Sequence, residues 1–284
     1  MNASMLFVPA NRPERYLKAQ AGEAGALILD LEDSVPPAAK DEARANLAQM
    51  LAAQPKHQQI WVRVNPASTG LLLKDMAAVV QAKPFGILLP KCSGRESLMP
   101  VCHQLDALET AFGVPVGHTQ ILAIATETGD SMFHLGEFAG ATRRLWGITW
   151  GAEDLATDLG AFGNRVDGRV TEPYRLARSM CLYAAAAAGV RAVDTVSVAI
   201  NAPEEVSAES AEAFRDGFVA KMAIHPSQIA PINAAFRYAP EQVEWSRRVI
   251  AAFEAQPAAG AFQLDGQMID IPHLKLARRI LESL

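Results

Sequence analysis

Residues 27–33 read LILDLED, a short apolar run that ends among acidic side chains. Seven other apolar runs follow the same scheme, and each ends at or near a polar, mostly charged residue. The eight runs span residues 6–9, 27–31, 60–64, 86–89, 121–125, 145–150, 192–196 and 222–224. Most are separated by enough chain for a helix, and strands that alternate with helices are typical of a parallel sheet. Eight such units predict an α/β fold, a closed (β/α)8 TIM barrel, whose C-terminal strand ends carry the active site.

Composition narrows the class of protein. The chain has 284 residues, half of them apolar, with a net charge of −5 and a pI near 5.7. A nucleic-acid-binding surface would be basic and clustered, so this balance argues against one. Three cysteines form no metal-binding or CxxC spacing, which indicates free thiols in a reducing compartment. We find no signal-peptide pattern and no apolar segment of membrane-spanning length, and we therefore expect a soluble, cytoplasmic protein without membrane contact.

Two regions lie outside the eight units. Residues 160–169 are Gly-rich and aperiodic, and we expect a long loop over the barrel mouth. Residues 1–238 are predicted to form the barrel, and 239–284 a C-terminal extension that docks on its own or a neighbouring subunit. The extension contains a helix at 240–254, a linker at 255–260, an Asp-Gly hairpin signal within 262–269 and a last helix from Pro272.

Two carboxylates, Glu127 and Asp154, follow neighbouring strands of the predicted barrel. Carboxylate oxygens are the ligands that Mg²⁺ prefers, and the ion takes one or two of them together with water and substrate. The alternative is that one of the two caps the helix that follows it.

Arg63 lies within a β-branched run, where a guanidinium needs partners. At a strand end it could bind a carboxylate or thioester oxygen, or it could form a structural ion pair with Asp30, Glu32 or Asp33. Lys91 is a candidate to balance the same acidic cluster. A Schiff-base role for Lys91 is a less favoured alternative.

Several segments together resemble the citrate lyase β-subunit family, within the HpcH/HpaI aldolase superfamily. They are LFVPANRPER, ALILDLEDSVPPAAKDEAR, WVRVNP, LLPK, ATETG, WGAEDLATDLG, AVDTV and AIHPSQI, in that order along the chain. The resemblance implies a TIM barrel, Mg²⁺-dependent cleavage or formation of C–C bonds on CoA or acyl-carrier thioesters, and homo-oligomers, as trimers or dimers of trimers.

Carried over to this sequence, the resemblance makes Glu127 and Asp154 the Mg²⁺ ligands, with Glu127 also near substrate, and Arg63 a contact to substrate and transition state. The segment GQMIDIPHLKLARRI resembles the C-terminal segment of malyl-CoA and citramalyl-CoA lyases. It makes Asp270 the proton donor or acceptor, delivered onto a neighbouring subunit's site. The local sequence equally permits Asp270 to be a helix cap before Pro272.

Four further residues are expected to contact substrate. Phe7 stands where some relatives carry an aromatic ligand contact, and Lys18 is expected to contact a phosphate. Ile224 and His225 lie at the end of the last predicted strand. His225 could equally be a loop histidine with satisfied hydrogen bonds.

These observations predict a Mg²⁺-dependent acyl-CoA lyase, with citramalyl-CoA, malyl-CoA and citryl-CoA as candidate substrates. One alternative is a class II pyruvate-type aldolase that acts without CoA. Another is a subunit of a larger, carrier-dependent lyase complex.

Overall fold

The computed structural model describes residues 2–52, 58–256 and 260–284. The predicted linker at 255–260 therefore lies partly outside the described residues. The chain divides into two compact units, Met1–Phe236 and Arg237–Leu284, and each is described by itself.

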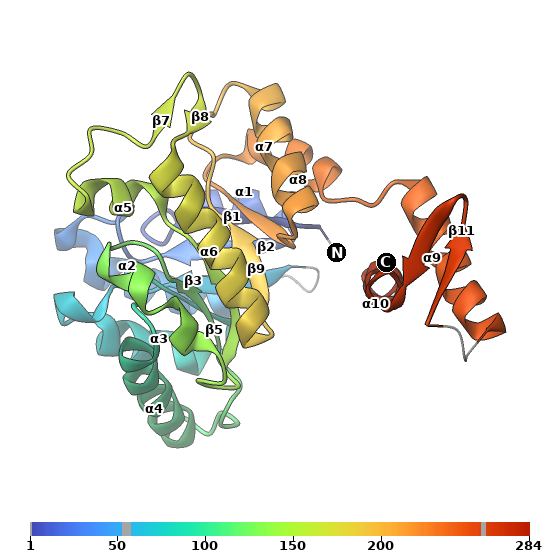
Figure 1. The fold of residues 1–284 in the computed structure, drawn as a ribbon. Coiled ribbons are helices and arrows are strands. Elements are labelled where there is room, and N and C mark those ends of the chain that lie inside the picture. The colour runs from blue at the N-terminus through green and yellow to red at the C-terminus, as the bar shows by residue number, and fades with distance from the viewer. Residues whose placement is uncertain (1, 53–57, 257–259) are drawn as a thin grey trace. The chain divides into compact units, whose positions relative to one another are not determined.

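The first unit is a closed parallel barrel (Figure 1). Within the described residues its eight strands are β1 Ser4–Pro9, β2 Ala26–Asp30, β3 Gln59–Arg63, β4 Gly86–Leu89, β5 Gln120–Ile124, β6 Leu145–Thr149, β9 Arg191–Asp194 and β10 Ala220–Ala223. Around the barrel they follow the order β1, β10, β9, β6, β5, β4, β3, β2, and β2 pairs with β1 again. All these pairings are parallel, so every strand points its C-terminal end to the same mouth. The predicted TIM barrel is confirmed.

Helices connect most strands and surround the barrel, as Figure 1 shows. They are α1 Pro13–Gln20, α2 Lys40–Ala52, α3 Leu72–Ala82, α4 Arg95–Ala111, α5 Ala152–Asp158, α6 Glu172–Ala188, α7 Pro203–Asp216 and α8 Ile229–Ala235. Short 3₁₀ turns lie at Pro37–Ala39, Ala67–Thr69, Asp130–Phe133, Leu135–Phe138 and Pro226–Gln228. In the part of the chain that the structure describes, no helix is long and apolar enough to cross a membrane.

Strand alternation divides the core into two layers, because successive side chains point to opposite faces. One face packs outward against the helices, and the other fills the barrel interior. Inside, Trp61 packs against Phe85 and Trp146 with ring centroids 5.0 Å away in each case. Phe85 precedes β4 and Trp146 is the second residue of β6, so this cluster fills the N-terminal end of the barrel. The barrel interior is thereby filled at its N-terminal end.

The segment 160–169, expected to be an irregular loop, instead enters a small hairpin. Strands β7 Arg165–Val166 and β8 Arg169–Val170 pair antiparallel. Asp167 and Gly168 form the turn with φ of 49° and 75°, and Asp-Gly is a preferred pair for such a left-handed turn. The Asn164 amide donates to Glu153 Oε1 at 2.8 Å, which ties the start of the hairpin to α5.

The second unit contains α9 Pro240–Ala255, β11 Ala261–Leu264, β12 Gln267–Asp270 and α10 Ile271–Glu282. β11 and β12 pair antiparallel around Asp265 and Gly266, so the hairpin predicted from Asp-Gly is present. A separate small core of Val249, Phe253, Ile269, Leu274 and Ala277 holds the hairpin against the two helices.

Candidate functional site

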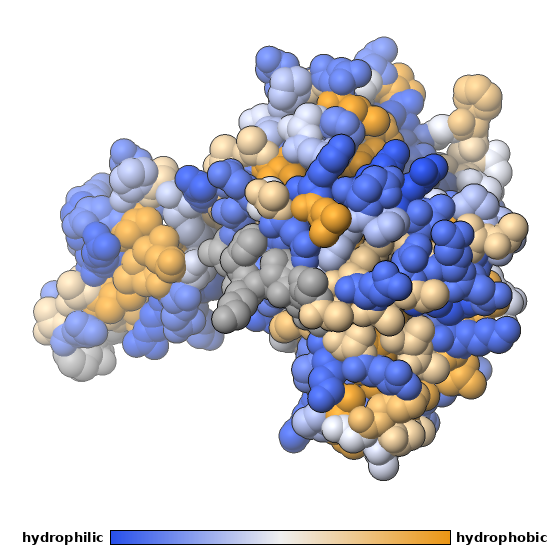
Figure 2. Space-filling model, turned by 180° about the vertical axis from the view of Figure 1, so that it is seen from behind, coloured by the Kyte–Doolittle hydropathy of each residue, from blue (hydrophilic) through white to orange (hydrophobic). Residues whose placement is uncertain are grey.

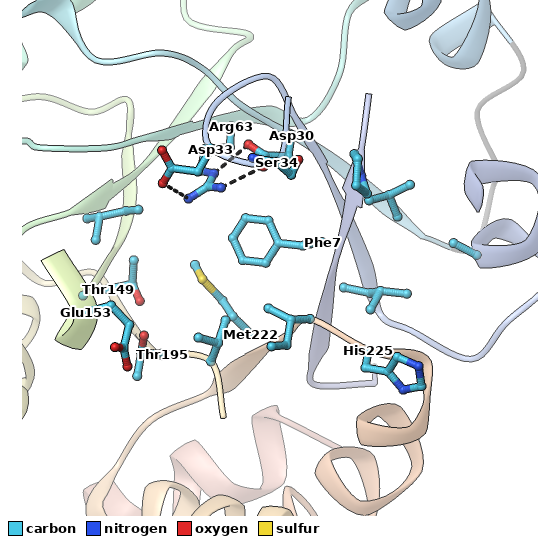
Figure 3. Close-up of a pocket in the computed structure, with 18 of the residues that line it drawn as sticks. Phe7, Asp30, Asp33, Ser34, Arg63, Thr149, Glu153, Thr195, Met222 and His225 are labelled. Atoms are coloured by element: carbon cyan, nitrogen blue, oxygen red, sulfur yellow. Dashed lines mark hydrogen bonds and ion pairs between the residues drawn. The ribbon is translucent and has the colours of Figure 1, made fainter. Parts of the chain in front are cut away.

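The C-terminal mouth of the barrel opens into a cavity of about 830 Å³. Seven site residues predicted in the barrel line it: Phe7, Lys18, Arg63, Glu127, Asp154, Ile224 and His225. Figure 3 shows Arg63 and Asp30 on one side of the cavity and Thr149, Glu153 and Thr195 on another, with Phe7 and Met222 between them. The fold thus brings together side chains from strands that are far apart in sequence.

Glu127 and Asp154 enter this mouth from neighbouring strands. Glu127 follows β5, and Asp154 lies in the first turn of α5, directly after β6. Lys91 contacts both of them: its backbone N–H donates to Glu127 Oε2, and its Nζ donates to Asp154 Oδ1 at 2.6 Å. Lys91 has a φ of 50°, a left-handed conformation that is uncommon for a residue with a side chain. One strained residue therefore holds the two carboxylates next to each other.

The environment of Glu127 disfavours its negative charge. Glu127 is only 4% exposed, and burial raises its pKa to about 8. The negative charges of Asp154 and Glu32 contribute to this rise in pKa, whereas the hydrogen bond from the Lys91 backbone N–H opposes it. A buried carboxylate beside other carboxylates is stabilised most directly by a bound cation.

The cavity that Glu127 and Asp154 line also holds a buried oxygen without a partner in the described chain. A Cβ atom on Gly151 would come within 2.8 Å of Glu127 Cγ, so any other residue at position 151 would clash with the Glu127 side chain. Thr149 Oγ1 lines the cavity, is fully buried and has no hydrogen-bond partner among the described residues. No three His, Cys, Asp or Glu side chains in the described ranges gather into a metal site made by protein alone. Two carboxylates with open neighbouring space fit Mg²⁺, which keeps several waters and binds substrate.

Arg63 pairs chiefly with Asp30. Its Nε and Nη2 donate to the two oxygens of the Asp30 carboxylate, both at 2.7 Å. Burial alone would raise the pKa of Asp30, but the hydrogen bonds and charge of Arg63 outweigh it and lower that pKa. The structural ion pair anticipated for Arg63 is therefore present. The guanidinium also lies 4.9 Å from the ring centroid of Phe7, at the cavity wall, so its charge faces the space where a ligand fits.

Glu32 completes the acidic cluster. Its Oε2 lies 2.9 Å from Arg63 Nη1, but the contact does not have hydrogen-bond geometry and this oxygen has no other partner in the described chain. Burial raises the pKa of Glu32 to about 7, against the lowering effect of Arg63. Arg63 thus neutralises Asp30 more completely than Glu32.

The outer part of the cavity carries basic side chains. Lys18 and Arg15 both line it from α1 and both are exposed. The sequence analysis did not identify Arg15, whose only sequence signal is the (i, i+3) spacing that places it on the same face of α1 as Lys18. Ile224 is 41% exposed at the rim. His225 Nδ1 lies 2.8 Å from Ser227 Oγ, so this ring also has the local partner expected of a loop histidine.

Two lysines bear on the alternative of covalent catalysis. Lys91 Nζ is bonded to Asp154, and Lys221 Nζ to Asp194 Oδ2 at 2.8 Å and to the Thr195 carbonyl at 3.0 Å. Lys221 is only 2% exposed. Neither lysine is among the described residues that line the cavity. Their positions give no support to a Schiff-base lysine.

Asp270 belongs to the second unit, where it ends β12 and is the N-cap residue of α10. Asp270 therefore occupies the helix N-cap position that the local sequence permits. Asp270 Oδ1 also lies 2.5 Å from His273 Nδ1 in the first turn of α10. No sequence pattern had drawn attention to His273.

Comparison with known proteins places this architecture in a family. The model of the HpcH/HpaI aldolase/citrate lyase family matches residues 3–226. A citrate lyase subunit beta-like protein of Mycobacterium tuberculosis is 34% identical over 97% of this chain and 93% of its own length. The mitochondrial citramalyl-CoA lyase of Rattus norvegicus is 30% identical over 98% of this chain and 84% of its own.

A solved structure agrees in fold over nearly the whole chain. The protein CitE of Mycobacterium tuberculosis, in complex with magnesium, acetoacetate and coenzyme A, superimposes with a TM-score of 0.81. The two chains are 34% identical, and the match covers 99% of this chain and 97% of CitE. The family match covers well over half of the sequence, and both relatives are at least 30% identical. The chain belongs to the HpcH/HpaI aldolase/citrate lyase family.

Proposed function

We propose that this protein is a Mg²⁺-dependent carbon–carbon lyase that cleaves, or forms, a 3-hydroxyacyl-CoA. The products of cleavage are a keto acid and acetyl-CoA, and citramalyl-CoA, malyl-CoA and citryl-CoA are the candidate substrates. The observation that carries the proposal is the buried Glu127 beside Asp154 at the C-terminal barrel mouth. It is supported by the likeness to a structure that holds magnesium, acetoacetate and coenzyme A.

In this proposal Glu127 and Asp154 would hold the ion, which would take the place of Lys91 Nζ beside Asp154. Bound there, Mg²⁺ supplies a Lewis acid for the oxygen atoms of a hydroxy or keto acid. Arg63, held rigidly by Asp30, presents positive charge where negative charge develops as the C–C bond breaks. No side chain becomes covalently attached to substrate.

Asp270 supplies the proton transfer. In cleavage it protonates the enolate carbon of the departing thioester, and in the reverse direction it takes a proton from acetyl-CoA. We place this residue on the site of a neighbouring subunit in a homo-oligomer, a trimer or a dimer of trimers, with 1–238 as catalytic barrel and 239–284 as docking extension.

Exposed apolar side chains support docking of this extension. Met268, two residues before Asp270, and Ile271, directly after it, are 70% and 43% exposed. On the face seen in Figure 2, the second unit carries a group of hydrophobic residues bordered by hydrophilic ones. Apolar surface beside an acid is suited to cover a catalytic cavity and exclude water from it.

The CoA part of the substrate occupies the outer cavity. Lys18 and Arg15 offer charge to its phosphates, and Phe7, Ile224 and His225 offer flat and apolar contacts. A cytoplasmic location stays a prediction.

A second function is favoured by the citrate lyase subunit beta-like relative. In that case the chain is a subunit that acts on an acyl-carrier thioester. A panel of CoA thioesters, assayed with the purified chain for acetyl-CoA release in the presence of Mg²⁺, decides between the two. Turnover of a CoA ester supports the stand-alone lyase. Inactivity on every CoA ester, with activity on a carrier-bound thioester, would contradict the stand-alone lyase and support the carrier-dependent subunit. Cleavage of a free hydroxy-keto acid alone would instead indicate the class II aldolase.

A further inference from the structure

The second unit contains an acid–imidazole pair that the proposed reaction does not yet use. Asp270 Oδ1 and His273 Nδ1 lie 2.5 Å apart, and the Asp270 backbone N–H points to the same nitrogen at 3.2 Å. The His273 ring packs edge-on against Trp245 of α9, with ring centroids 6.3 Å apart. Ile269, directly before Asp270, is 1% exposed in the small core. The pair is therefore held from both sides.

The short contact requires a proton between the two side chains. A carboxylate oxygen and an unprotonated ring nitrogen both carry lone pairs, and they repel each other at 2.5 Å. Either Nδ1–H donates to the carboxylate or a protonated Asp270 donates to Nδ1. Nδ1 carries either one proton or one lone pair in the plane of the ring. It can therefore accept a hydrogen bond from the Asp270 backbone N–H only when it does not donate to Oδ1. One ring nitrogen of His273 therefore lies within hydrogen-bond distance of both the carboxylate and the backbone N–H of Asp270.

Both side chains reach water. The side chain of His273 is 40% exposed and that of Asp270 is 36% exposed. An imidazole in contact with both solvent and an acid is a common proton shuttle.

We propose that His273 is a positioning residue for Asp270 and relays its proton to and from solvent. This inference rests on the proposed function of Asp270. In cleavage, Asp270 gives its proton to the enolate carbon, so that a C–H bond forms and an O–H bond breaks. His273 in its neutral Nδ1–H form then takes a proton from solvent at Nε2 and passes its Nδ1 proton to Oδ1, and the neutral Nε2–H tautomer that remains returns to the Nδ1–H form by proton exchange with solvent. In the reverse direction Asp270 takes a methyl proton from acetyl-CoA and passes it to Nδ1 of the neutral Nε2–H tautomer, and the imidazolium so formed releases its Nε2 proton to water.

The alternative is that His273 only stabilises the start of α10. A Gln at the third helical position also bonds to the N-cap backbone N–H, as in a capping box. His273→Gln therefore keeps the cap and removes the proton carrier. His118→Gln, an exposed histidine between α4 and β5, is the matched control.

The test uses the full-length oligomer with Mg²⁺. We expect His273→Gln to lower kcat by at least about 10-fold, less than the loss of the acid itself, with KM and Tm unchanged. The exchange of acetyl-CoA methyl hydrogens in D₂O, followed by NMR, should slow to a similar degree. Added imidazole should restore much of the rate of His273→Ala, because a small base replaces a relay but does not replace a cap.

The outcomes separate the two ideas. Wild-type turnover and exchange by His273→Gln, with an inactive Asp270→Asn, would overturn the relay and leave the role of Asp270 intact. Normal turnover by Asp270→Asn would overturn both the relay by His273 and the catalytic role of Asp270. If His273→Gln also lowers Tm, failure of imidazole to rescue His273→Ala overturns the relay, and rescue supports it.

Discussion

Gly151 and Glu127 lie so close together that a Cβ atom at position 151 would come within 2.8 Å of Glu127 Cγ. The φ of Gly151 is −122°, which any residue adopts, so the need for glycine is steric. The Gly151 backbone N–H also donates to Thr126 Oγ1 at 3.2 Å, so the turn has little freedom to move away. The glycine of the segment GAED thus reserves space for the buried carboxylate.

We expect Gly151→Ala to displace Glu127 and weaken Mg²⁺ binding by about 10-fold or more, which corresponds to about 1.4 kcal/mol. Isothermal titration with Mg²⁺ measures the effect. Gly136→Ala is the matched control, because a Cβ there meets no atom within 4 Å and its φ is not positive. Equal Mg²⁺ affinity in both variants would contradict the steric role of Gly151.

Removal of either carboxylate should have a larger effect on the same measurement. Glu127→Ala and Asp154→Ala each delete one of the two protein ligands proposed for the ion. We expect Mg²⁺ affinity to fall by at least about 100-fold, the upper part of the range for lost supporting contacts at metal sites. Circular dichroism checks that both variants remain folded. Wild-type-like affinity in both would show that the ion binds elsewhere.

The sequence alone was a good guide to the barrel because its strands are short apolar runs with clear ends. The run 86–89 coincides with β4, and 27–31 is displaced from β2 by a single residue. Since all strands are parallel, their polar ends had to meet at one mouth, which placed Glu127 and Asp154 together.

Contacts that depend on packing could not be predicted in this way. Lys91 reaches Asp154 across 63 residues of sequence, and its left-handed backbone leaves no pattern in the segment LLPK. His273 follows Asp270 by three residues, which is the ordinary spacing of a helix cap. The sequence therefore could not predict that the two side chains lie 2.5 Å apart. The hairpin at 165–170 had a local signal, Asp167–Gly168, but its strands are two residues long and show no alternation.

The two lysines near the site give a test of the reaction class. If the enzyme depends on Mg²⁺, borohydride with substrate should trap no adduct on Lys91 or Lys221, because both ammonium groups are bound to aspartates. EDTA should abolish activity, and added Mg²⁺ should restore it. Mass spectrometry of the treated protein identifies any modified lysine. A Schiff base that forms in the presence of EDTA would assign the chain to the class I aldolases.

Arg63 should combine a structural and a catalytic effect, and two variants separate them. Arg63→Met leaves the buried Asp30 carboxylate without its partner, and breaking such a pair costs about 3–5 kcal/mol in unfolding free energy. Arg63→Lys retains a positive charge but loses the two parallel bonds to Asp30. We expect Arg63→Lys to be folded yet to have a kcat lowered by about 10²-fold or more, as for the loss of one donor to a developing oxyanion.

Denaturant unfolding and steady-state kinetics measured on the same preparations provide the comparison. A lowered unfolding free energy together with normal kcat in Arg63→Lys would make Arg63 a structural residue only.

The last prediction is that Asp270 acts in trans. Its unit has its own core, so the acid can be presented on a preformed element rather than on a loose tail. Loss of one proton-transfer group typically lowers the rate by about 10²- to 10⁴-fold. Asp270→Asn should therefore lower kcat while Mg²⁺ affinity and oligomeric state, measured by titration and light scattering, stay unchanged.

Subunit mixing tests the trans arrangement directly. Asp270→Asn supplies an intact barrel site without the acid, and Glu127→Ala supplies the acid with a damaged metal site. If Asp270 of one subunit completes the barrel of its neighbour, oligomers that contain both variants hold some sites with both residues intact, and activity should return in proportion to the mixed fraction. Each variant alone, treated by the same dissociation and reassembly, is the control. Reassembled oligomers shown by mass spectrometry to contain both chains, yet without activity, would mean that Asp270 serves its own barrel, because in that arrangement no site in the mixture contains both residues.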